Sequence, residues 1–147
     1  MSTEQFHSLV QNGLKAMHDG ETLMALMNFE DAARISKPPL VRSCLAYCLA
    51  KEKKLYSKAI AMAMSAKQEN PQKSLFYLNL GRIYLLAGHK KSAMATFRQG
   101  LKMERNPQII DELKVLGFRK PPPLPSLARE NLLNRMLGKC LTMANMR

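Results

Sequence analysis

Cys44 and Cys48 are the residues of this chain whose type and spacing come closest to a reactive pair. They are one helical turn apart, a spacing that can hold a metal ion or react as a dithiol. Only His7 and His18 could complete a metal site, and no Cys-x-x-Cys sequence occurs. Because a free cysteine commonly behaves as a small apolar side chain, we interpret both as core residues and expect no metal and no cofactor.

Other catalytic patterns are missing from the sequence as well. The histidines are scattered, no paired carboxylates share a helical face with a nearby nucleophile, and no glycine loop of the phosphate-binding kind is present. We therefore predict that the protein is not an enzyme.

The composition favours helices. The 147 residues fit one domain with a real core. Alanine, leucine and methionine dominate and tryptophan is absent, and unbranched side chains lose little rotamer freedom in a helix. We find no alternating apolar and polar run that reads as a strand. The sequence predicts an all-α protein.

The chain shows no signal for export or membrane insertion. Its first residues lack the basic start and apolar block of a signal peptide. No stretch approaches the roughly 20 apolar residues of a membrane span. Three cysteines, an odd number, do not suggest a disulfide framework. We expect a cytoplasmic location.

One stretch, from Ser74 to Pro107, organises the rest of the chain. It carries apolar and small residues at fixed offsets: Tyr77, Leu80, Gly81, Tyr84, Ala93, Phe97 and Pro107. This pattern is similar to the tetratricopeptide repeat (TPR), a helix–turn–helix unit of about 34 residues with W-x2-L-G-x2-Y, then A-x3-F, then P. Tyr77 replaces the tryptophan, and Gly100 replaces a usual alanine.

The same register recurs twice upstream. Steps of about 34 residues lead from Gly81 to Tyr47 and Gly13, from Ala93 to Ala59 and Ala25, from Phe97 to Ala63 and Phe29, and from Gly100 to Ala66 and Ala32. Small residues are expected where two antiparallel helices approach closely, so we predict that Gly81 faces Ala93. Tyr47 breaks this rule, which leaves the middle repeat either splayed or repacked.

The resemblance implies a right-handed α-solenoid of three TPR-type helix hairpins, at about residues 3–37, 39–70 and 71–106. We expect turns at residues 18–20, 53–55 and 87–89. An amphipathic capping helix follows residue 107, with Gly117 as its C-cap. Residues 1–117 would form the repeat domain, and residues 118–147 an extended proline-rich strap and a terminal helix packed on it. This tail resembles endings of bacterial repeat proteins.

The resemblance also implies a peptide-binding groove lined by the first helix of each hairpin. Carried over to this sequence, the family's groove positions include His18 and Leu86, and the ten residues that we select as the groove are Val10, Leu14, Met17, Cys44, Cys48, Lys51, Leu75, Leu78, Arg82 and Leu85. Val10 and Leu14 replace the lysine and asparagine that bind a peptide carboxylate in the best-known members, so we expect no carboxylate clamp. A mostly apolar groove with Arg82 as an isolated cation suits an amphipathic helix.

The charge of the chain leaves a second function open. The net charge is +12, and between residues 53 and 102 the only acid is Glu69. The predicted basic surface comprises Lys53, Lys54, Lys58, Lys90, Lys91 and Arg98. A surface of one charge sign attracts anionic partners, or it serves only to keep a helical protein soluble. The lack of exposed aromatics for base stacking argues against RNA.

We therefore predict a non-catalytic protein–protein interaction module, an adaptor or assembly scaffold, that binds a helix or peptide of another protein. An acidic partner suits the positive charge. The alternative is a basic helical repeat that binds RNA or another anionic surface. Self-association stays open, because an apolar stripe in the tail has three places to dock: the capping helix, the groove or a second copy. Its residues are Leu132, Leu133, Met136, Leu137 and Leu141.

Overall fold

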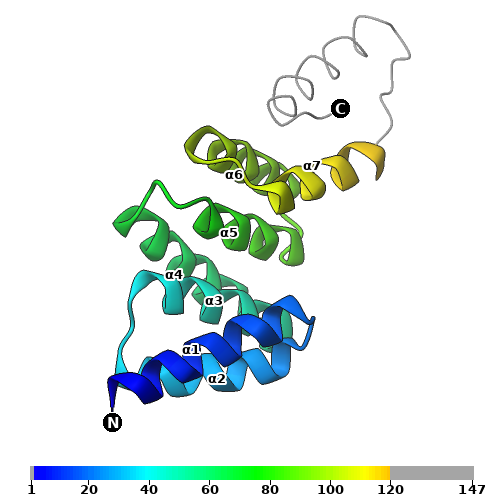
Figure 1. The fold of residues 1–147 in the computed structure, drawn as a ribbon. Helices are drawn as coiled ribbons and strands as arrows, with labels where there is room; N and C mark the ends of the chain where they lie inside the picture. Colours follow the sequence, from blue (N-terminus) through cyan, green and yellow to red (C-terminus); the bar gives the residue numbers. More distant parts are fainter. Residues whose placement is uncertain (1, 120–147) are drawn as a thin grey trace, which may run out of the picture.

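The computed structural model describes residues 2–119, which form seven α-helices (Figure 1). They are α1 (Thr3–His18), α2 (Thr22–Ile35), α3 (Pro39–Lys53), α4 (Tyr56–Glu69), α5 (Ser74–Leu86), α6 (Lys90–Met103) and α7 (Pro107–Arg119). The described residues contain no strand. The predicted all-α class and the three predicted turns are confirmed. The predicted strap and terminal helix lie outside the described residues.

Two of the three turns within the hairpins are closed by glycines that the sequence places there. Gly20 and Gly88 have φ of 80° and 85° in the first and third turns, a region where glycine meets no steric penalty. Lys54 takes the same left-handed region in the second turn, with φ of 54°. The Ser2 side chain caps α1 by accepting a hydrogen bond from the Gln5 N–H at 3.1 Å.

The helices pair into hairpins that stack in chain order. Helix α1 packs on α2, α3 on α4, and α5 on α6 (Figure 1). Between hairpins, α3 packs on α2 and α5, α4 packs on α5, and α7 covers α6. The helical-repeat solenoid predicted from the sequence is thereby confirmed. No helix among residues 2–119 combines the length and apolarity needed to cross a bilayer.

The interiors of the first and third hairpins are each filled by one large and one small residue, 16 positions apart in the chain. A Cβ atom added to Gly13 would lie 2.7 Å from Phe29, and one added to Gly81 would lie 2.2 Å from Phe97. The atoms nearest to a Cβ at Gly81 belong to Phe97, and the contact of Gly81 with Ala93 stays a prediction. The glycines are needed because the phenylalanine rings occupy the space of a side chain.

The middle hairpin reverses this arrangement. Tyr47 stands where the other hairpins have glycine, and the fully buried Ala63 stands where they have phenylalanine. Tyr47 packs against the cluster that contains Ala63, and α3 and α4 remain packed on one another. The middle repeat is therefore repacked rather than splayed.

Helix α7 is held at the end of the stack by apolar and polar contacts. Its Ile109, Ile110, Leu113 and Leu116 are buried. The preceding Asn106 donates from Nδ2 to the Ser74 hydroxyl at 2.9 Å and accepts from the Gln108 N–H at 2.9 Å. The helix continues to Arg119, so the prediction that Gly117 ends it was wrong. Without a competing turn, glycine stays helical at a cost of up to about 1 kcal/mol.

Candidate binding groove

A cleft of about 180 Å³ runs across the first helices of all three hairpins. We call it the inner cleft. It is lined by Leu14, Met17 and His18 of α1, Cys44 and Tyr47 of α3, Leu75, Leu78, Asn79 and Arg82 of α5, and Gln108 of α7. A second hollow, of about 380 Å³, shares Tyr47 and Arg82 with it and adds Leu85, Leu86 and Glu112. The two hollows form a continuous surface built from four separate helices.

Asn79 is the buried polar group of the inner cleft. Its side chain is fully buried, and Nδ2 donates to the Ser43 hydroxyl at 2.9 Å and to Cys44 Sγ at 3.8 Å. Among residues 2–119, its Oδ1 atom has no hydrogen-bond donor. An unsatisfied buried acceptor costs about 1–3 kcal/mol, so Asn79 places a polar cost inside the core beneath the cleft.

Arg82 is not the isolated cation that we expected. Its Nε donates to Glu112 Oε2 at 2.7 Å, and both side chains are about one-quarter exposed. The pair joins α5 to α7 across the second hollow. The sequence could not show this pair, because Glu112 is 30 residues away and belongs to a different packing unit. The surface near Arg82 is consequently close to neutral.

The structure gathers six of the ten predicted groove residues at the inner cleft: Leu14, Met17, Cys44, Leu75, Leu78 and Arg82. Leu85 lines the adjoining hollow. Val10 and Cys48 belong instead to the buried cluster of the first two hairpins, and Lys51 is exposed and lines neither hollow. Val10 and Cys48 are each one helical turn from a lining residue, Leu14 and Cys44, but are covered by neighbouring side chains.

Four further lining residues were missed in the sequence analysis: Tyr47, Asn79, Gln108 and Glu112. Asn79 could have been predicted from the sequence. It is the only amide in the apolar run of α5, and it lies three residues before Arg82, a predicted groove residue. Residues three apart share a helical face.

Burial raises the pKa of the Tyr47 phenol, so its hydroxyl remains a hydrogen-bond donor at neutral pH.

Cys44 and Cys48 are both fully buried. Burial raises the pKa of each thiol from 9.0 to about 12, and in Cys48 the neighbouring Cys44 adds to the increase. Within residues 2–119, no three metal-ligating side chains converge. At neutral pH both thiols stay protonated, and they fill space in the core.

This burial makes a testable difference to thiol reactivity. In a Cys140→Ser variant, which leaves only these two thiols, we expect a disulfide reagent at pH 8 to react at least about 1000-fold more slowly than with a free cysteine. The factor follows from a three-unit rise in pKa, since only the thiolate reacts. Two thiols should react after denaturation with guanidinium. Fast reaction of the native protein would contradict the buried placement.

The predicted basic residues are spread over α3, α4, α6 and the turn after α3. Lys53, Lys54, Lys58 and Lys91 are exposed, while Lys90 and Arg98 are half-buried. The Nζ atom of Lys53 lies 3.7 Å from a carboxylate oxygen of Glu30. That these residues act as one binding surface stays a prediction.

Among solved structures, the chain is similar to a thermophilic TPR protein from Thermus thermophilus. The sequence identity is 18%, the match covers 95% of this chain and 91% of that one, and the TM-score is 0.46. No family model matches the sequence, and no curated protein matches it. The organisation of the chain is visible in its own packing: three stacked helix hairpins, arranged in the order that the tetratricopeptide pattern predicts.

Proposed function

We propose that this protein is a non-catalytic binding module that holds an amphipathic helix or peptide of another protein in the inner cleft. The observation that carries the proposal is the composition of the cleft, which draws residues from α1, α3, α5 and α7. A surface of this kind exists only when all three hairpins are stacked. Stacked repeats commonly present such extended surfaces to partners.

The side chains of the cleft indicate the chemistry of the ligand. Leu14, Met17 and Leu75 are partly exposed apolar side chains that can receive apolar anchors. Arg82 is already neutralised by Glu112, so a ligand carboxylate is not required. Asn79 is fully buried beneath this surface and cannot contact a ligand directly. An apolar helical face that needs no carboxylate fits the exposed side chains of the cleft.

Photo-crosslinking would identify the partner and the site together. A photoreactive amino acid at Leu14, in the cleft, is compared with one at Met103, which is 47% exposed at the end of α6. We expect one protein partner to be captured at position 14 and not at position 103. Capture at both positions, or at neither, contradicts the proposal.

The affinity of the captured partner then tests the cleft directly. We expect Leu14→Arg to weaken binding at least about 10-fold, because a cation replaces an apolar contact. Met103→Arg is the matched control, with the same added charge, and should change nothing. If nuclease treatment abolishes all capture, the alternative of a basic nucleic-acid-binding repeat replaces this proposal.

A further inference from the structure

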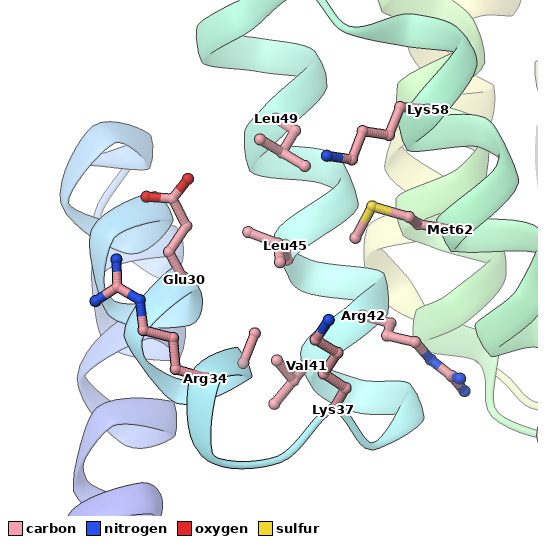
Figure 2. A pocket seen from close by; sticks show the side chains of 10 residues that line it. Glu30, Arg34, Lys37, Val41, Arg42, Leu45, Leu49, Lys58 and Met62 are labelled. Atoms are coloured by element: carbon pink, nitrogen blue, oxygen red, sulfur yellow. The ribbon is translucent and has the colours of Figure 1, made fainter.

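A groove of about 750 Å³ lies between the first and second hairpins, and it shares no lining residue with the inner cleft. We call it the outer groove. Its lining residues are Glu30, Ala33, Arg34, Lys37, Val41, Arg42, Leu45, Leu49, Lys58 and Met62 (Figure 2). They come from α2, α3, α4 and the link before α3. Figure 2 shows α3 as the floor, with α2 and α4 as the two walls.

The outer groove and the inner cleft use different faces of α3. Val41, Leu45 and Leu49 recur every four residues and form an apolar stripe along the floor of the outer groove. Val41 and Leu49 are themselves buried, so Leu45 is the leucine of this stripe that a ligand would contact. Cys44 and Tyr47 line the inner cleft, and at about 100° per residue Tyr47 lies opposite Leu45 while Cys44 lies on the flank between the two surfaces. Leu45 and Met62 are half-buried. A ligand in the outer groove would therefore not compete for the inner cleft.

The rim of the outer groove is cationic. It carries four basic side chains and the single carboxylate of Glu30. Arg34 pairs with Asp31 at 2.7 Å and Arg42 with Glu69 at 2.5 Å. Lys37 and Lys58 are exposed, and neither has a carboxylate within 4.0 Å among residues 2–119. Two cations are thus left to meet a ligand.

The two lysines stand at opposite ends of the apolar stripe. In Figure 2, Lys58 reaches from α4 toward Leu49, and Lys37 lies beside Val41. Val41 and Leu49 are eight residues apart on one helix, which corresponds to about 12 Å along its axis. A ligand helix with apolar residues on one face would match the apolar stripe. Carboxylates about two turns apart beside that face would match the two lysines.

We propose that the outer groove is a docking site for an acidic amphipathic helix of another protein. An acidic helix is favoured over other occupants because its carboxylates complement the charges of Lys37 and Lys58. Residues 120–147 of this chain contain five basic residues and one acidic residue, and a second copy brings a net charge of +12. Either would place cations against Lys37 and Lys58. Nucleic acid would supply anions but no aliphatic side chains to pack on the half-buried Leu45 and Met62.

The proposal can be tested with model helices and the full chain. The probe is a labelled synthetic amphipathic helix with leucines on one face and glutamates at its edges. Two control peptides are its lysine counterpart and an acidic peptide of the same composition with a scrambled order. Binding is followed by fluorescence anisotropy and by the methyl NMR signals of methionine. We expect the acidic amphipathic helix alone to bind, and to shift the signal of Met62 but not that of the exposed Met103.

Charge reversal locates the site. We expect Lys37→Glu with Lys58→Glu to weaken binding of the acidic helix at least about 10-fold, since two attractive contacts become repulsive. Lys102→Glu with Lys114→Glu changes the net charge equally at exposed sites outside the groove and should have little effect. Unchanged circular dichroism confirms that both variants are folded.

Several outcomes would overturn the proposal. Equal weakening by both double variants indicates non-specific attraction, and equal binding of the scrambled peptide shows that the apolar stripe is not used. Tighter binding of single-stranded RNA through Lys37 and Lys58 makes the groove a nucleic-acid site. Self-association that depends on these lysines assigns the groove to a second copy. Absence of binding by the acidic helix excludes the site.

Discussion

Gly81→Ala is expected to lower the free energy of unfolding by about 3 kcal/mol, although alanine is the better helix former. A Cβ at this position lies 2.2 Å from the Phe97 ring, which is itself fully buried. Overpacking of this kind typically costs about 1–3 kcal/mol and sometimes more. The loss should outweigh the gain in helix propensity of up to about 1 kcal/mol. Urea unfolding followed by circular dichroism measures it.

Two controls separate this clash from other effects of the substitution. Gly117 is also helical, but a Cβ there meets nothing within 4 Å, so Gly117→Ala should be stabilising by up to about 1 kcal/mol. In a Phe97→Val background, Gly81→Ala should cost little, since valine lacks the ring atoms that clash. The same loss in both backgrounds would show that Phe97 is not the cause.

Ile109→Asp is expected to detach α7 from the stack. Ile109 is fully buried in the cluster with Phe97 and Leu113, and an unpaired carboxylate there would be strongly destabilising, by at least about 3 kcal/mol. Because each repeat contacts only its neighbours, unfolding should begin in α7 and the adjoining α6. Hydrogen exchange should accelerate first in these helices, and the melting temperature should fall.

Val115→Asp is the matched control on the same helix. Val115 is 49% exposed, so the new carboxylate stays in water and stability should change by less than about 0.5 kcal/mol. Equal destabilisation by the two variants would mean that α7 does not dock through the face that carries Ile109.

The sequence predicted the hairpins well because their signals are local. Helix formers, turn glycines and a period of about 34 residues act within one repeat. Glycines at positions 20 and 88 adopt the left-handed backbone that closes the first and third turns. The second turn is the exception. Lys54 closes it with the same left-handed backbone, and a lysine gives no sign of that conformation in the sequence.

Packing within a hairpin was harder to predict, because it depends on pairs of residues. The period aligned Gly81 with Tyr47 and Phe97 with Ala63, and Tyr47 taken alone suggested a defect in the middle repeat. Taken as pairs, Gly–Phe and Tyr–Ala both fill the same space between two helices. Side-chain volume is matched across the pair rather than at either position.

The sequence by itself determined that this protein is a series of helix hairpins with small residues at their contacts. Only the tertiary structure decided which faces became binding surfaces. It buried Cys48 and Val10, left Leu14 partly in water, neutralised Arg82 with Glu112 and opened the outer groove beside Leu45. The physical reason is that these outcomes depend on how successive hairpins pack against one another. That packing sums the contacts of many side chains far apart in the chain, and no local pattern encodes it.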